Sequence, residues 1–179
     1  MILKETALAG VFVVEPELRM DERGFFARVF CEKEFSALNL AFRFVQSSVS
    51  FNSRKGTLRG IHFQVEPKAE CKLVRCTRGA IYDVILDLRR GSPTFCRWIG
   101  LELNQDNRQA LYVPAGCGHG FQTLTEDSEV FYLMSEFYYP ELARGVRWND
   151  PRFAVEWPLP NPHMSARDAG YPDFADGRE

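Results

Sequence analysis

The sequence contains three histidines, the side chains best suited to accept a proton near neutral pH: His62, His119 and His163. His62 lies in an apolar run, residues 56–64, that also carries Arg59, and Lys72 follows after a short loop. A buried cation needs an anionic partner, and arginine is well shaped to bind phosphate. The run therefore predicts a histidine base beside a site for a phosphate-bearing ligand.

Metal ligation is the main alternative use of such histidines. His62 and His119 each stand alone, with no HxH pair and no glutamate at ligand spacing. A catalytic metal site usually has three protein ligands of this kind. The sequence therefore predicts neither a metal nor another cofactor.

Gly60 bears on how the apolar run is built. In a regular strand Arg59 and His62 face opposite sides, because side chains alternate with a period of two. Gly60 lies between them and is suited to a β-bulge. One extra residue at this point would bring both side chains to one site.

Residues 129–139 predict a single strand in which the even-numbered positions share a face. Tyr132 and Tyr138 then point the same way, while Phe131 and Leu133 belong to a packing face. A rise of about 3.3 Å per residue separates the two tyrosines by about 20 Å. Tyrosines on strands are more often core residues, but two phenols on the inner wall of a barrel suit a proton donor and a stacking platform.

Short β-runs separated by Gly, Pro and Asn predict an all-β sandwich or barrel. The clearest runs lie at 72–76, 80–88, 111–113 and 120–124. In the second of these, Asp83 and Asp87 face away from the apolar side chains. One short helix is expected at 32–40. The proline-rich tail, about 158–179, should wrap the barrel, because proline cannot join a central strand.

The composition fits one folded unit. The 179 residues are 45% hydrophobic and 13% aromatic, so we expect a single domain over 1–179. The net charge is −2 with no basic cluster, which argues against nucleic acid or a membrane surface as a partner. Residues 1–10 lack the apolar stretch of a signal peptide, and the five cysteines form no CxxC pair. We therefore expect a cytoplasmic protein with reduced thiols.

A series of short motifs runs through the chain. In order they are Asp21-Glu22-Arg23-Gly24-Phe25-Phe26, Leu58-Arg59-Gly60-Ile61-His62-Phe63-Gln64, Lys72-Leu73-Val74, Asp83-Val84, Asp87-Leu88-Arg89, Ser92-Pro93-Thr94-Phe95, Val113-Pro114-Ala115-Gly116, His119-Gly120-Phe121, Tyr132 with Tyr138, Trp148-Asn149-Asp150-Pro151, Trp157-Pro158 and Ser165-Ala166-Arg167-Asp168. Over about residues 10–168 the chain resembles the dTDP-4-dehydrorhamnose 3,5-epimerase family of cupin proteins. Each motif alone is weak support, whereas so many in this order and spacing are strong support.

The resemblance implies a cupin jelly-roll barrel with short peripheral helices, assembled as a homodimer that exchanges N-terminal strands. It also implies an epimerase of a nucleotide-linked 4-keto-6-deoxy sugar in deoxysugar biosynthesis. The enzyme would invert C3, C5 or both through an enolate. A ketone at C4 acidifies the protons on both flanking carbons, and the enolate formed needs a cation or a strong donor at its oxygen.

The resemblance further implies roles for single residues. His62 would be the general base, held by Asp168, and Tyr132 would be the acid on the opposite face of the sugar. Lys72 would stabilise the enolate. The substrate-binding residues would be Arg23 and Arg59 at the diphosphate, His119 at the sugar, Tyr138 against the nucleobase, and Gln46, Ser48 and Arg167 at further contacts.

Three positions depart from the family pattern. Arg28 and Ala143 stand where relatives carry glutamate, and Ser48 stands where they carry asparagine. These positions lie among nucleotide or sugar contacts, so the reaction type is predicted more firmly than the substrate. The alternatives are a C3-only or C5-only epimerase or a ketoisomerase on another nucleotide sugar, a non-catalytic sugar-nucleotide-binding cupin, and a metal-dependent cupin oxygenase or isomerase.

Overall fold

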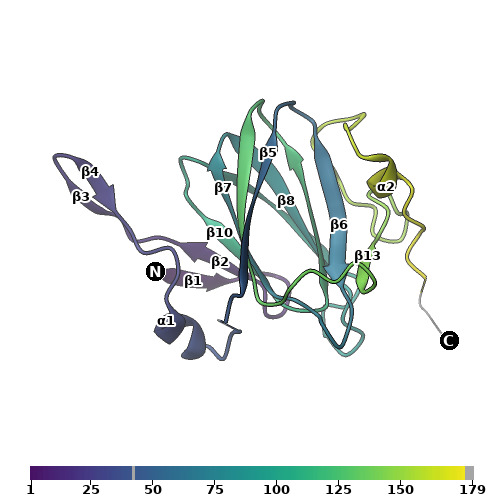
Figure 1. The fold of residues 1–179 in the computed structure, drawn as a ribbon, viewed down its shortest axis with the longest axis horizontal. Helices are drawn as coiled ribbons and strands as arrows, with labels where there is room; N and C mark the ends of the chain where they lie inside the picture. The colour runs from purple at the N-terminus through teal and green to yellow at the C-terminus, as the bar shows by residue number, and fades with distance from the viewer. Residues whose placement is uncertain (42, 176–179) are drawn as a thin grey trace.

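The computed structural model describes residues 1–41 and 43–175, and its main feature is a pair of β-sheets that face each other (Figure 1). One sheet has six strands in the order β1-β2-β10-β7-β12-β5, and the other has five in the order β13-β6-β11-β8-β9. Neighbouring strands are antiparallel throughout. The predicted cupin jelly roll is confirmed.

The strands and helices follow the chain in a simple order. They are β1 (Ile2–Glu5), β2 (Phe12–Glu15), β3 (Arg19–Asp21), β4 (Gly24–Phe26), α1 (Glu32–Ser36), β5 (Gln46–Asn52), β6 (Leu58–Gln64), β7 (Lys72–Arg78), β8 (Ala80–Asp87), β9 (Trp98–Asn104), β10 (Ala110–Val113), β11 (Cys117–Thr123), β12 (Ser128–Met134), β13 (Ala143–Gly145) and α2 (Ala166–Ala169).

The main apolar core lies between the two sheets. Strand alternation sends every second side chain inward, so Val74 and Cys76 of β7 join Ile81 and Ile85 of β8 in one cluster. All four are fully buried. Burying an aliphatic side chain stabilises the fold by about 1.5–3 kcal/mol, so this cluster holds the two walls of the barrel together.

Segments from the two ends of the chain cover the outer faces of the sheets. Phe35 of α1 packs with Leu73 and Tyr112 on the outside of the six-stranded sheet. The C-terminal tail packs Trp157 and Phe174 on the outside of the five-stranded sheet. In Figure 1 this tail, with α2, runs beside β6.

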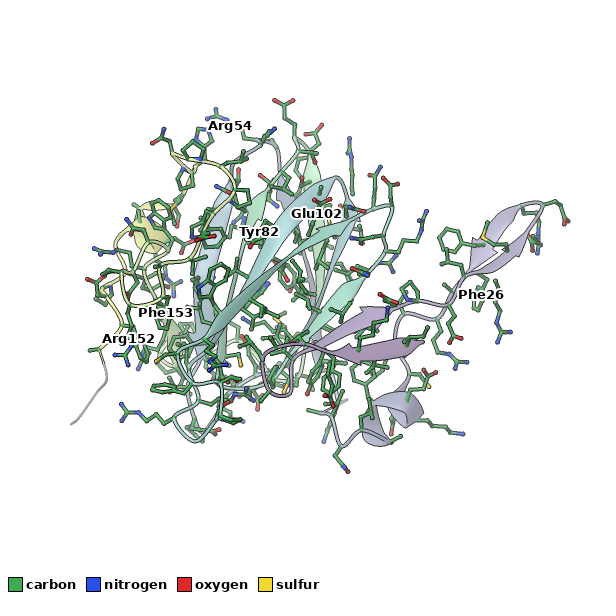
Figure 2. All side chains as sticks on the ribbon, turned by 180° about the vertical axis from the view of Figure 1, so that it is seen from behind. Phe26, Arg54, Tyr82, Glu102, Arg152 and Phe153 are labelled. Carbon is green, nitrogen blue, oxygen red and sulfur yellow. The ribbon has the colours of Figure 1, made fainter. Side chains whose placement is uncertain are left out.

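The hairpin of β3 and β4 projects away from the barrel (Figure 1). Figure 2 shows Phe26 on this hairpin, far from the barrel strands. Met20 is 69% exposed and Phe26 is 74% exposed. Edge strand β5 also exposes apolar side chains, with Val49 at 59% and Phe51 at 49%. These are large apolar groups to leave in water.

Two predicted elements are shorter than expected. The helix ends at Ser36 instead of residue 40. The strand predicted over 129–139 ends at Met134. Ser135 hydrogen-bonds through its backbone N–H to the Cys71 carbonyl, and Gln64 binds the backbone on both sides of Tyr138. The bond to Cys71 still follows the pairing with β7, whereas the Gln64 contacts tie the chain around Tyr138 to β6 of the other sheet. In the described part of the chain, no helix has the length and apolar character needed to cross a membrane.

Candidate active site

A cavity of about 390 Å³ lies between the two sheets. We call it the inter-sheet pocket. Strands β5, β6, β7, β11, β12 and β13 and helix α2 all contribute side chains to its wall. Ten of the eleven site residues predicted from the sequence line it: His62, Tyr132, Asp168, Lys72, Arg59, Gln46, Ser48, His119, Tyr138 and Arg167.

His62 and Asp168 form a hydrogen-bonded pair in this pocket. Nε2 of His62 lies 2.7 Å from Oδ1 of Asp168, although the two residues are far apart in sequence. Burial raises the pKa of Asp168, but the hydrogen bond and charge of His62 and the Gly60 N–H outweigh it, so the pKa lies below its usual value. The carboxylate is therefore charged at neutral pH. It can orient the imidazole and stabilise an imidazolium.

The C-terminal tail is fixed where it delivers Asp168. The backbone of His163 bonds to the segment that leads into β6. Its N–H donates to the Gly56 carbonyl, and its carbonyl accepts from the Leu58 N–H. Ser165 then caps α2, accepting a hydrogen bond from the Asp168 N–H at 3.1 Å. The carboxylate reaches back to the Gly60 N–H at 3.2 Å.

Gly60 is the point at which Arg59 and His62 come to one side. Opposite β11, His62 pairs with His119 and Arg59 pairs with Phe121, so β6 has one more residue between the pairs than β11. This is the bulge that the sequence suggested, and both side chains line the pocket. Gly60 has φ +118, and a Cβ there would lie 2.5 Å from the Gly120 Cα, so only glycine fits.

Tyr132 of β12 reaches the pocket from the opposite sheet to His62. Its ring meets the His119 ring edge-on, with centroids 6.0 Å apart. Burial, with a smaller contribution from the Asp83 carboxylate, raises the pKa of Tyr132 well above its usual value. The phenol therefore stays protonated at neutral pH and can act as a proton donor.

His119 forms a second histidine–carboxylate pair. Its Nε2 lies 2.7 Å from Oδ1 of Asp83, and both residues are almost fully buried. Asp83 projects from the inner face of β8, which it shares with Ile81 and Ile85 of the main core, whereas the sequence only placed it opposite the predicted apolar face of this strand. The pair fixes the imidazole of His119 in the wall of the pocket beside Tyr132.

The wall carries more positive than negative charge. Four cations line it, Arg59, Lys72, Arg144 and Arg167, against the carboxylates of Glu70 and Asp168. Nε of Arg59 donates to Oδ1 of Asn52 at 2.7 Å, which fixes the guanidinium near the start of β6. An excess of arginine and lysine around a concave site suits a diphosphate.

Tyr138 reaches the pocket by a different route from the one predicted. It lies beyond the end of β12, so the prediction of a single strand that carries both tyrosines is wrong, and strand alternation does not place this residue. The side-chain amide of Gln64 donates to the Phe137 carbonyl, and its oxygen accepts from the Tyr139 N–H. Tyr138 is thereby held at the rim, 55% exposed, with its hydroxyl 3.5 Å from a nitrogen of Arg167.

Arg23 is the one predicted site residue that does not line the pocket. It lies on the projecting hairpin, where its side chain is 82% exposed and pairs with Asp21 at 2.6 Å. Arg28 also lies outside the pocket and pairs with Glu34 at 3.1 Å. Of the three departures from the family pattern, only Ser48 and Ala143 line the pocket of this chain.

Sequence analysis missed several residues of the site. Glu70 lies two positions before Lys72, and this spacing could have placed both on one face of an extended segment. Asp83 carried a weaker signal, as a carboxylate within an apolar strand, where a buried charge needs a partner. Gln64 acts through its amide on a distant loop, and no pattern in the sequence shows that. Among the described residues, no group of three or more His, Cys, Asp or Glu is arranged to hold a metal ion.

The fold and the site together define an acid–base isomerase of the cupin class. Comparison with known proteins specifies it further. The family model described as dTDP-4-dehydrorhamnose 3,5-epimerase matches residues 5–176, and the chain belongs to this family.

Individual relatives agree with the family assignment. The dTDP-4-dehydrorhamnose 3,5-epimerase of Pseudomonas aeruginosa is 42% identical over 97% of each chain. The crystal structure of the Bacillus anthracis enzyme of that name, with TDP and PPi bound, is 42% identical with a TM-score of 0.93, covering 97% of this chain and 99% of that one. ChmJ, a 3'-monoepimerase from Streptomyces bikiniensis in complex with dTDP-quinovose, is 35% identical with a TM-score of 0.86, covering 94% and 85%.

Proposed function

We propose that this chain epimerises a dTDP-linked 4-keto-6-deoxyhexose at C3 and C5 by removing and returning protons through an enolate. The observation that carries the proposal is the placement of a base and an acid on opposite walls of one pocket. His62, paired with Asp168, comes from the five-stranded sheet, and Tyr132 comes from the six-stranded sheet. Inversion needs an acceptor on one face of the sugar and a donor on the other.

The first step is proton removal by His62. Its imidazole takes the proton from a carbon next to the C4 ketone, and Asp168 stabilises the imidazolium that forms. Lys72, only 8% exposed, presents its ammonium to the C4 oxygen, where the enolate charge develops. A fixed cation in a water-poor site stabilises such a charge strongly.

The second step is proton return by Tyr132 to the opposite face of the same carbon. The raised pKa of this phenol keeps its proton available. Before the next inversion the His62 imidazolium releases its proton to solvent, and the Tyr132 phenolate takes up a proton from solvent. Applying the two steps at each carbon flanking the ketone inverts both.

The diphosphate and the nucleobase take the remaining contacts. Arg59 and Arg167 supply fixed guanidinium groups for the phosphates, and Tyr138 offers an exposed ring at the rim for the base. His119, held by Asp83, contacts the sugar. Gln46 and Ser48 of β5 complete the wall near the nucleotide.

Arg23 lies too exposed on its own chain to line the pocket, but it could contact the diphosphate bound by a second copy of the chain. A two-stranded hairpin alone in water is only marginally stable, and this one exposes Met20 and Phe26. The exposed face of β5, with Val49 and Phe51, offers an apolar surface of the same kind. We propose a homodimer in which each hairpin crosses to its partner and brings Arg23 to the partner's diphosphate.

We also propose that the enzyme works in the cytoplasm. All five cysteines are free thiols in the structure. Three of them, Cys71, Cys76 and Cys117, are buried in the cores of the fold. Free structural thiols are typical of proteins in a reducing compartment.

Incubation with dTDP-4-dehydro-6-deoxy-D-glucose tests the proposal. NMR of the product should show inverted configurations at C3 and C5. Inversion at C3 alone would give this chain the activity named for ChmJ, and no inversion with tight nucleotide binding would make it a binding protein. A thermal-shift series with dTDP, UDP, GDP and CDP tests the base, because a ligand at one hundred times its Kd stabilises the fold by about 2.7 kcal/mol.

A further inference from the structure

Glu70 places a carboxylate beside Lys72 in the wall of the inter-sheet pocket, and the proposed mechanism does not use it. Oε1 of Glu70 lies 3.1 Å from Nζ of Lys72, with the side chains 11% and 10% exposed. Both residues line the cavity. Nζ of Lys72 also lies 3.4 Å from the carbonyl oxygen of His62. The ammonium is therefore held between the His62 carbonyl of β6 and the Glu70 carboxylate.

The backbone of Glu70 is fixed although it lies just before β7. The next residue, Cys71, donates its N–H to Oγ of Ser135 at 2.8 Å, and the Ser135 N–H donates to the Cys71 carbonyl at 3.0 Å. These bonds tie the segment to the end of β12. Glu70 and Lys72 are two positions apart in an extended segment, so their side chains project to the same side.

This ion pair differs from the one next to it on the surface. Lys68 and Glu136 are 3.2 Å apart, but their side chains are 38% and 23% exposed. Pairs in contact with water contribute little, because solvent screens them. A pair as buried as Glu70 and Lys72 interacts strongly, and removing one partner leaves an uncompensated charge.

We propose that Glu70 is a positioning residue that holds the Lys72 ammonium so that one of its hydrogens points to the C4 oxygen of the substrate. An ammonium has three N–H donors. Glu70 and the His62 carbonyl accept two of them, and the third faces the cavity. The inference rests on the role proposed above for Lys72.

Glu70→Gln tests the proposal because it keeps the shape of the side chain and removes its charge. The C4 oxygen gains negative charge only as the enolate forms and not in the bound ketone, so kcat should fall by about 10-fold or more while KM stays within about 3-fold. Glu70→Asp, which keeps the charge, should recover part of the loss. Glu136→Gln removes a carboxylate from the neighbouring surface pair and should leave kcat and KM unchanged.

A double-mutant cycle with Lys72→Met separates positioning from a general structural effect. Retained dTDP binding shows that each variant is folded. If Glu70 acts through Lys72, Glu70→Gln costs nothing further in the Lys72→Met background. An equal loss in both backgrounds would overturn the inference, and so would a slow Lys72→Met enzyme beside a normal Glu70→Gln enzyme. A normal Lys72→Met enzyme would instead show that the role proposed for Lys72 is wrong, and the inference on Glu70 would fall with it.

Discussion

In the proposed mechanism, the base His62 and the acid Tyr132 lie on opposite walls of the inter-sheet pocket. His62 is oriented by Asp168, whose own position depends on the cap at Ser165 and on the Gly60 N–H. Tyr132 is oriented by burial against His119. Each reactive group is thus held by contacts that the substrate does not have to form. Such preorganisation lets binding energy act on the transition state.

His62→Asn removes the base and keeps a polar side chain of similar size. Solvent-deuterium exchange at C3 and C5 should fall by about 10²- to 10⁴-fold, the usual contribution of a general base. Affinity for dTDP, measured by calorimetry, should change little. His163→Asn alters an exposed histidine in the tail and serves as the matched control. Exchange that survives in His62→Asn at more than a few per cent would assign the base to another residue.

Tyr132→Phe removes only a hydroxyl. It should lower kcat by about 10²-fold or more with little change in KM, because the proton is needed only as the carbon is reprotonated. The raised pKa of Tyr132 adds a pH prediction: loss of the phenol proton should not cause the alkaline fall in activity below about pH 10. Steady-state kinetics over pH measures both effects.

Tyr138 provides the contrast to Tyr132 at the rim of the pocket. Tyr138→Phe should be mild, and Tyr138→Ala should weaken dTDP binding by roughly 1–3 kcal/mol if the ring stacks on the base. An inactive Tyr138→Phe beside an active Tyr132→Phe would mean that the roles of the two phenols are reversed.

At the scale of elements, the connection between β8 and β9 shows how the barrel is closed by polar contacts. Asp87, fully buried at the end of β8, accepts hydrogen bonds from Arg89, Ser92 and Thr94. Arg89 also donates to the Ala9 carbonyl and so ties the β1–β2 turn to this loop. Burial raises the pKa of Asp87, but the hydrogen bonds outweigh it and lower the pKa to about 2.

Asp87→Asn should therefore lower the free energy of unfolding at pH 7 by about 3 kcal/mol, measured by urea denaturation. A carboxyl with a depressed folded pKa contributes stability above its unfolded pKa, near 3.8, and loses it as the pH falls through about 2. The difference between wild type and variant should shrink over that window. Asp106→Asn, at an exposed turn after β9, is the control. A difference that did not change down to pH 2 would contradict the assigned pKa.

The elements also show what sequence patterns can and cannot predict. The glycine between Arg59 and His62 indicated the bulge, because that signal is local. Alternation separated Asp83 from Val84 and Leu86, but it could not show which face is the inner one, because both faces of β8 are buried. The end of β12 depends on Gln64, a side chain from another sheet, so the pattern of 129–139 extended the strand too far. The pairing of Asp168 with His62 came from the family resemblance, since no local rule connects residues so distant in sequence.

For the whole molecule, the central structural prediction is that the projecting β3–β4 hairpin is exchanged between the two chains of a dimer. In a strand-exchanged dimer, Arg23 of one chain serves the pocket of the other. Arg23→Ala and His62→Asn homodimers should then both be weak at low substrate concentration. Co-refolded mixtures should recover about a quarter of the wild-type activity, because half the dimers are mixed and each has one intact site.

Sedimentation analysis gives the control for this experiment. The wild-type protein should be a dimer, and Phe26→Ser should shift it toward monomer, whereas Phe137→Ser, at another exposed aromatic, should not. A wild-type monomer, or mixtures with no recovered activity, would contradict the exchange of hairpins.

Deuterium incorporation from solvent tests the central claim most directly. The wild-type enzyme would convert dTDP-4-dehydro-6-deoxy-D-glucose in D₂O, with the product examined by NMR for label at each sugar carbon. Proton removal by His62 and return by Tyr132 on both flanking carbons predict deuterium at C3 and C5 and at no other ring carbon. Inverted product without solvent deuterium at the inverted carbon would contradict an enolate formed by proton exchange at this site.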